Sequence, residues 1–168
     1  ALASRVSYAN DTETVEAAIC DLGKFLGAES RRPEKETNRG PDNLWIFGDR
    51  AFCIEMKSEK FSKLWKDDAG QIAVSARWVS DNFPGMAEIS QVIGSDVVEA
   101  DNVGDFSGLT KVMTSEIVLD LIVRLRGLIV GLITQGPLFG EEPANIQRQL
   151  GPHGILPQQI QGYLRAIK

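Results

Sequence analysis

Histidine and cysteine are scarce in this sequence, and their scarcity argues against several classes of site. Among 168 residues there is one histidine, His153, and there are two cysteines, Cys20 and Cys53. His153 lies in a Gly-Pro-His-Gly turn, so neither a Ser-His-Asp nor a Cys-His catalytic arrangement has support. The cysteines have neither the spacing of a zinc site nor that of a disulfide framework. We therefore expect reduced thiols in a cytoplasmic protein.

Glycine-rich phosphate loops and long apolar runs are also missing. The sequence contains no Walker-type loop and no G-x-G-x-x-G pattern. The most apolar run, residues 117–133, includes Asp120, Arg124 and Arg126, so we expect a core or interface helix and no membrane span. The first residues lack the features of a signal peptide. Because the sequence does not begin with Met, we expect a processed chain or a domain of a larger protein.

A surplus of basic residues is missing as well. Lys and Arg together number 18 against 23 Asp and Glu, which gives a formal net charge of -5. This balance argues against a nonspecific DNA-packaging protein, but an enzyme needs only a local basic rim around acidic metal ligands. The length and the hydrophobic content of 43% fit one domain with a single sizeable core.

Hydrophobic periodicity predicts an α/β fold with a mixed central sheet flanked by helices. Asn10 and Glu13 resemble a capping box for the first helix, and Thr114 is expected to cap the last long one. Residues 29–40 are expected to be partly a strand and partly a mobile loop. The other predicted elements are a helix over 12–26, a hairpin of strands 43–47 and 51–57 turning at Gly48-Asp49, a helix from Asp67 or Asp68 to about 82, strands 88–94 and 97–99, and a helix ending near 133.

The end of the chain differs in composition from the rest. Residues 135–168 contain four of the seven prolines and two short amphipathic stretches, 141–150 and 157–167. We therefore predict a domain over residues 1–134. Residues 135–168 are expected to form a small helical extension that packs on this core or docks a neighbouring domain.

Three charged residues stand where strands usually avoid charge. Asp42 is at the start of one predicted strand, and Glu55 and Lys57 lie on the next. Because side chains alternate along a strand, Glu55 and Lys57 share one face, opposite Phe52 and Ile54. A charge that is buried without a partner is costly, so these charges favour a joint function. Carboxylates and a backbone carbonyl are the oxygen ligands that Mg²⁺ prefers.

Pro41-Asp42 followed by Glu55-Met56-Lys57 resembles the motif of the PD-(D/E)xK nuclease superfamily, which has the restriction-endonuclease-like fold. Glu16 in the first helix and Gln71 in the second also match positions that this superfamily often uses. The resemblance covers roughly residues 11–133 and implies a core in the order helix, three strands, helix and strand, with a following helix. It implies a deoxyribonuclease that hydrolyses phosphodiester bonds with Mg²⁺ or Mn²⁺.

The resemblance also implies a role for each matched residue. Asp42, Glu55 and the backbone carbonyl of Met56 would hold the metal ion, and Glu16 would hold a metal-bound water or a second ion. Lys57 would position the attacking water or help to deprotonate it. Gln71 would orient the phosphate or the lysine.

One position departs from the pattern of the exonuclease branches. Those branches have a tyrosine four residues after the glutamine, whereas this chain has Ser75. We therefore expect an endonuclease in preference to an exonuclease. The partners expected are DNA, a fused or associated helicase or methyltransferase domain, and a second copy of the chain in a homodimer.

Contacts with nucleic acid are predicted near the motif. Residues 29–66 contain nine basic and seven acidic residues, and residues 60–66 alternate lysines with aromatic residues. Lysines can bind phosphates and an exposed tryptophan can stack on a base. The residues expected to contact nucleic acid are Arg39, Lys60, Lys63, Trp65 and Lys66. The alternative is a solvated loop with Phe61 and Trp65 packed into the core.

Other interpretations remain open for the whole chain and for each residue. A protein can keep this fold without the chemistry and bind nucleic acid or a protein partner, and an unrelated α/β domain could dimerise through its apolar third helix. Asp42 alone would also suit a turn, and Glu55 with Lys57 an exposed ion pair. Glu16 would suit a solvated helix surface and Gln71 an ordinary first turn.

Overall fold

A six-stranded mixed sheet organises the computed structural model, which describes residues 1–135 and 148–168. The strands lie side by side in the order in which they occur along the chain. Antiparallel pairs join β1 to β2, β2 to β3 and β5 to β6, whereas β3, β4 and β5 are parallel. The predicted α/β class with a mixed sheet is therefore confirmed. The strands are β1 (Glu29–Arg31), β2 (Asn43–Phe47), β3 (Arg50–Met56), β4 (Glu88–Gly94), β5 (Thr110–Met113) and β6 (Arg165–Ala166).

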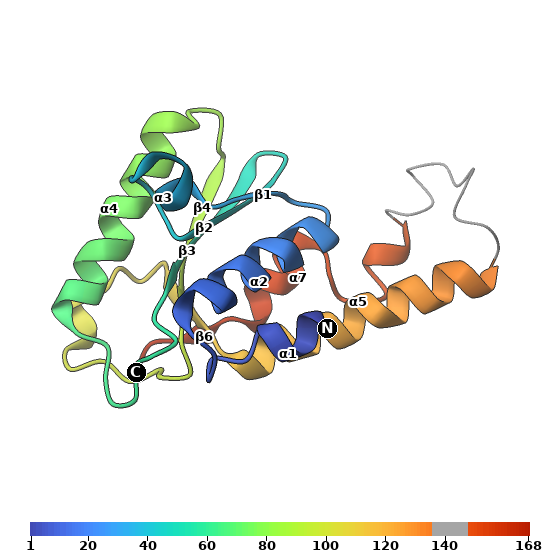
Figure 1. Ribbon diagram of the computed structural model, residues 1–168. Coiled ribbons are helices and arrows are strands. Elements are labelled where there is room, and N and C mark those ends of the chain that lie inside the picture. The colour runs from blue at the N-terminus through green and yellow to red at the C-terminus, as the bar shows by residue number, and fades with distance from the viewer. Residues whose placement is uncertain (136–147) are drawn as a thin grey trace.

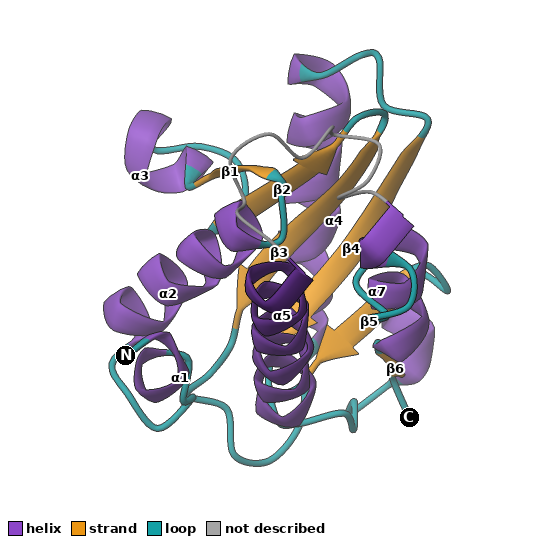
Figure 2. Ribbon diagram, turned by 90° about the vertical axis from the view of Figure 1, so that its right-hand side faces the viewer, coloured by secondary structure: helices purple, strands orange, loops and turns teal. Residues whose placement is uncertain are grey.

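Helices cover both faces of this sheet. Figure 2 shows α2 and α5 in front of the strands and α4 behind them, and Figure 1 shows α4 and α5 on opposite sides of the molecule. The parallel connection between β3 and β4 runs through α4, as parallel pairing requires. The helices are α1 (Leu2–Arg5), α2 (Thr12–Phe25), α3 (Pro33–Thr37), α4 (Lys66–Asn82), α5 (Ser115–Gln135) and α7 (Pro157–Tyr163), with a short 3-10 helix over Val103–Asp105.

The alternation of side chains along β3 divides its residues between two apolar clusters. Phe52, Ile54 and Met56 pack in the cluster that includes residues of α2, α5 and α7. Ala51 and Cys53 point the other way, into the cluster that includes residues of α4. Glu55 follows on this second face, so the predicted two-residue period of β3 is confirmed and carries Glu55 to the side of the sheet that α4 covers.

Several local predictions agree closely with the structure. The β2–β3 hairpin pairs Phe47 with Arg50 across the Gly48-Asp49 turn, and Gly48 has the positive φ of 63° that such a turn favours. The hydroxyl oxygen of Thr114 accepts a hydrogen bond from the N–H of Ile117 at the start of α5. The bounds of β4 are those predicted, and α2 ends one residue earlier than expected.

Other local predictions were wrong. The side chain of Asp11, not Asn10, caps α2 by accepting from Thr14, while Asn10 donates to the carbonyls of Ser4 and Arg5. No strand forms over residues 97–99, and β5 at Thr110–Met113 was not predicted. The connection expected as a loop after β1 contains α3, which begins at Pro33. Proline suits the first position of a helix because its missing N–H has no partner there.

Residues 148–168 contribute to both the core and the sheet. Ile155 and Ile160 are completely buried in the cluster that includes residues of α2 and α5. The stretch predicted as one amphipathic helix to residue 167 is helical only to Tyr163, after which Arg165–Ala166 pair with β5. Most of the other stretch, 141–150, lies outside the described residues. Among the helices that the structure describes, none has both the length and the apolar character needed to cross a membrane.

Candidate active site

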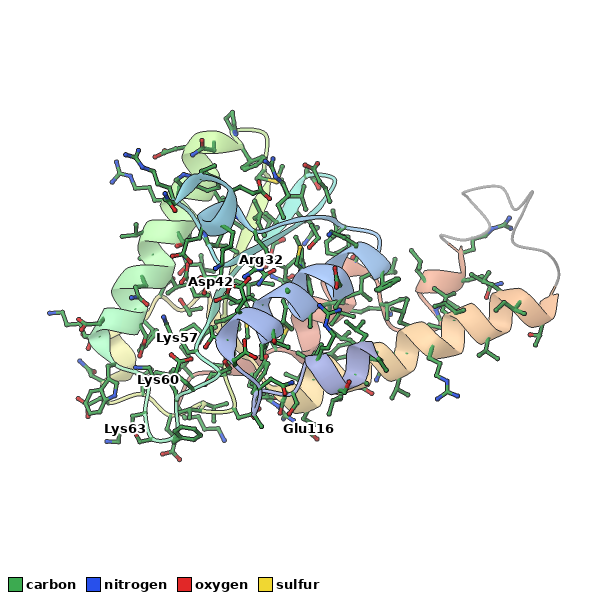
Figure 3. The ribbon with its side chains drawn as sticks, viewed as in Figure 1. Arg32, Asp42, Lys57, Lys60, Lys63 and Glu116 are labelled. Atoms are coloured by element: carbon green, nitrogen blue, oxygen red, sulfur yellow. The ribbon has the colours of Figure 1, made fainter. Side chains whose placement is uncertain are left out.

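A cavity of about 700 Å³ lies where the α3–β2 connection, the end of β3 and the first half of α4 meet. Each of these segments contributes polar side chains, so residues far apart in the sequence come together here. Figure 3 shows Asp42 and Lys57 between α4 and the helices on the other side of the sheet. The lining residues are Glu34 from α3, Gly40 and Asp42 from the α3–β2 connection, Glu55 and Lys57 from the end of β3 and the residue after it, and Lys66, Asp67, Gly70, Gln71, Val74 and Ser75 from α4.

The backbone around Gly40 and Met56 positions Asp42. Gly40 has a φ of 88°, and a Cβ at this position would lie 2.7 Å from the Trp78 ring, so only glycine fits. Asp42 follows two residues later, directly before β2. Its Oδ2 accepts a hydrogen bond of 2.7 Å from the N–H of Met56, and the side chain is buried. The structure thus places the N–H of Met56, the residue whose carbonyl is a predicted metal ligand, beside Asp42.

Ser75 in α4 orients the second buried acid, Glu55. Its hydroxyl group donates a hydrogen bond of 2.5 Å to Glu55 Oε1, and both side chains are more than nine-tenths buried. In the sequence this serine stood out only as a departure from the exonuclease pattern. No local signal predicted its contact with Glu55, because the two residues are brought together only by the packing of α4 on β3.

Burial and mutual repulsion disfavour the ionised forms of these acids. Burial is the main cause that raises the pKa of Asp42 to about 8. A hydrogen bond with the carboxyl group of Glu34 and the charge of Glu55 raise it further. Burial also raises the pKa of Glu55, against the opposing effects of the Ser75 hydroxyl and the Lys57 ammonium. Two adjacent acids that resist ionisation form a pair that a cation would stabilise.

Glu34 is a cavity residue that the sequence reasoning missed. It lies in the first turn of α3, and its N–H donates a hydrogen bond of 3.3 Å to the carbonyl of Pro41, next to Asp42. Its side chain raises the pKa of Asp42 through a hydrogen bond and that of Glu55 through its charge. The available signal was Pro33, because proline favours the first position of a helix, but nothing in the sequence indicated that Glu34 would approach Asp42.

Glu16 lies beside the cavity but not in its wall. Its carboxylate accepts a hydrogen bond of 2.5 Å from Arg32, which also binds Glu13. It lines a neighbouring depression of about 420 Å³ that shares Glu34 with the main cavity. Burial raises the pKa of Glu16 although the hydrogen bond from Arg32 opposes this. Glu16 can therefore act at the site only if Arg32 shares the Glu16 carboxylate with a ligand or releases it.

Lys57 and Gln71 both face the cavity. Lys57 follows β3 directly, and its N–H donates to the carbonyl of Gly94 in β4, which fixes the start of its side chain. Among the described residues, the Lys57 ammonium forms no ion pair, although it lies close enough to Glu55 to lower the pKa of that acid. Gln71 is exposed on α4 and lines the same cavity. Both side chains are thus free to contact a ligand there.

The residues predicted to contact nucleic acid have different surroundings. Lys66 is exposed and lines the cavity, and Arg39 is exposed in the α3–β2 connection. Lys60 pairs with Asp68 at 3.2 Å and Lys63 with Asp101 at 3.4 Å. Trp65 is 45% exposed and Phe61 is 94% exposed, so the alternative in which both rings pack into the core is wrong.

The donor set suits a cation that keeps part of its water shell. Among the described residues, no group of three or more His, Cys, Asp or Glu side chains is arranged to hold a metal ion. Two carboxylates are nevertheless sufficient for Mg²⁺, which usually retains several waters. Asp42 and Glu55 are both buried and share one cavity. The residues present therefore fit a divalent ion bound by two protein carboxylates.

Comparisons of this chain with protein-family models, with curated proteins and with solved structures gave no match.

Proposed function

We propose that this chain is a metal-dependent nuclease domain that hydrolyses phosphodiester bonds in DNA. The observation that carries the proposal is the buried pair of Asp42 and Glu55, which faces one cavity together with Lys57. A purely structural role does not account for two adjacent acids whose pKa values are both raised. Perturbed acids in a cavity are typical of functional sites.

Each cavity residue has its own proposed role in hydrolysis. Asp42 and Glu55 would hold Mg²⁺ or Mn²⁺, with the Met56 carbonyl as a further ligand. A bound ion would polarise the scissile phosphate and stabilise the charge that develops on it. Lys57 would orient the attacking water against the phosphate, and Gln71 would hold a phosphate oxygen from α4.

The arrangement of elements supports the resemblance to PD-(D/E)xK nucleases. Apart from the short α3, the chain from α2 to β4 follows the order helix, three strands, helix and strand that this resemblance implies. Asp42 precedes one strand of the hairpin and Glu55 lies near the end of the other. With Ser75 in place of a tyrosine, an endonuclease domain of a larger DNA-processing protein fits the chain better than an exonuclease.

The proposal is tested by incubating the full chain with circular and linear DNA, single and double stranded, in Mg²⁺ or Mn²⁺. We expect the circular substrates to be nicked or linearised, and EDTA to abolish this activity. Titration of Mn²⁺ in a calorimeter should independently show a binding site. A protein that binds neither ion and cuts none of the substrates would contradict the proposal. DNA binding in EDTA without cleavage would favour a catalytically inactive binding module.

Replacement of Ser75 by alanine should weaken metal binding without unfolding the protein. The variant loses the hydrogen bond that orients Glu55, and loss of a group that orients a ligand costs about 10-fold to 100-fold in metal affinity. Calorimetric titration with Mn²⁺ measures the change. Ser80→Ala, an exposed serine on the same helix, is the matched control. Equal affinities for Ser75→Ala and Ser80→Ala would show that the hydroxyl does not prepare Glu55 for the ion.

A further inference from the structure

The segment that connects β3 to α4, residues 57–65, exposes two aromatic rings, and the lysines at its two ends, Lys57 and Lys66, line the cavity. Phe61 is 94% exposed, more than any other large hydrophobic side chain among the described residues, and Trp65 is 45% exposed. We refer to residues 57–66, which contain Phe61, Trp65 and the four lysines Lys57, Lys60, Lys63 and Lys66, as the aromatic loop.

The base of the aromatic loop is anchored to the body of the protein. Leu64 is completely buried, its N–H donates to the carbonyl of Glu99 and its carbonyl accepts from Asp101. The side chain of Lys63 pairs with Asp101 as well. These contacts hold the segment on both sides of Leu64, so exposure of Phe61 is compatible with a defined loop.

The aromatic loop is continuous with the proposed active site through lysines. Lys57 and Lys66 lie at its two ends and both line the cavity that contains Asp42 and Glu55. In Figure 3, Asp42, Lys57, Lys60 and Lys63 follow one another from the cavity towards the loop. Lys60 and Lys63 pair with Asp68 and Asp101, whereas Lys57 and Lys66 form no ion pair among the described residues. A polyanion that rests on the loop would therefore meet the positive charges of Lys57 and Lys66 at the cavity that contains the two carboxylates.

Exposed aromatic rings next to lysines favour the binding of single-stranded over double-stranded nucleic acid. The face of a base is covered by its neighbours in a duplex, whereas an unpaired base can stack on an aromatic side chain while lysines bind the backbone. We propose that the aromatic loop binds single-stranded DNA by stacking Phe61 and Trp65 on unpaired bases. This inference rests on the proposed nuclease function and narrows its substrate to DNA that is single stranded at the site.

Fluorescence anisotropy with the full chain in EDTA tests the inference, because binding is then measured without cleavage. The probes are a labelled oligothymidylate of about 20 nucleotides and a hairpin duplex of similar length. Phe61→Ala should weaken binding of the single strand about 10-fold, as expected for the loss of one stacked base, and Phe61→Tyr should restore it. Phe25→Ala is the matched control, since Phe25 is 61% exposed at the end of α2.

The outcomes separate this inference from the proposed nuclease function. Unchanged single-strand affinity in Phe61→Ala, or an equal loss on single strand and duplex, would overturn the stacking role. Metal-dependent cutting of duplex DNA could still be observed in that case, and the nuclease proposal would stand. Conversely, single-strand binding that depends on Phe61, with no cleavage in any metal, would support the aromatic loop and contradict the nuclease proposal.

Discussion

Circular DNA should remain intact when Asp42 or Lys57 is replaced by alanine, under conditions in which the unchanged protein nicks it with Mn²⁺. Asp42→Ala removes a proposed metal ligand that is buried in the cavity. Lys57→Ala removes the ammonium beside Glu55 that is proposed to orient the water. Groups that act directly on a reacting phosphate contribute rate factors of about 100-fold to 1000-fold or more. Gel quantification of nicked and supercoiled DNA over time measures the loss.

Matched variants keep this result interpretable. Asp105→Ala and Lys111→Ala remove an acid and a lysine that lie outside the cavity lining, and both proteins should cut at the rate of the unchanged chain. Metal affinity distinguishes the two proposed roles: Asp42→Ala should lose Mn²⁺ binding, whereas Lys57→Ala should retain it. Nicking that persists in Asp42→Ala would show that the cut is made elsewhere or by a contaminant, and the assignment would fail.

The metal-free protein should become less stable as pH rises, and Asp42→Asn should remove much of this dependence. The pKa of Asp42 is raised from 3.8 to about 8 in the folded protein, so the folded state binds this proton more tightly than the unfolded state. The resulting stabilisation is complete below pH 3.8 and is lost progressively as pH approaches 8. A shift of this size corresponds to roughly 4 kcal/mol in the free energy of unfolding at pH 7.

Urea unfolding in EDTA at about pH 5 and about pH 8 measures the effect. Asparagine retains an oxygen that can accept from Met56 but carries no charge, so the variant should be the more stable protein and its advantage should grow with pH. Asp105→Asn, an exposed acid, serves as the control. A constant difference between Asp42→Asn and the unchanged protein at both pH values would mean that the acid is already ionised without cost.

Addition of Mn²⁺ should reverse the order of stability. An ion that binds only the folded state stabilises it in proportion to the logarithm of its concentration over its dissociation constant. The unchanged chain would gain this stabilisation, whereas Asp42→Asn would not. Asp42 would then be retained for binding and not for folding, which is the usual relation between stability and function at charged sites.

The parts of the site that depend on local pattern could be predicted from the sequence. The alternation of apolar and polar residues in β3 predicted that Glu55 and Lys57 share the face opposite Phe52 and Ile54. The predicted β2–β3 hairpin implies that Asp42 lies at the same end of the sheet. Both inferences need only the period of a strand and the geometry of a two-residue turn. The predicted α/β class follows from the same periodicities.

The missed elements show the limit of such patterns. β5 is a short strand whose pairing with β4 and β6 is decided by packing, and its four residues after the Ser107-Gly108 turn are too few to show the period of a strand. The cap of α2 could not be assigned between adjacent Asn10 and Asp11, because both residue types accept from a helix N-terminus. The neighbouring backbone decides which of the two residues caps the helix. Here the carbonyls of Ser4 and Arg5 bind the side chain of Asn10, and Asp11 caps α2.

The sequence by itself determined the α/β class, the β2–β3 hairpin with its alternating β3, and the placement of Asp42, Glu55 and Lys57 at one end of that hairpin. The tertiary structure alone decided that Ser75 donates to Glu55, that Glu34 approaches Asp42 and that Arg32 binds Glu16. The physical reason is the range of the interactions. Periodicity records which face of an element is buried, whereas the partner of a buried polar group depends on which distant element packs against it.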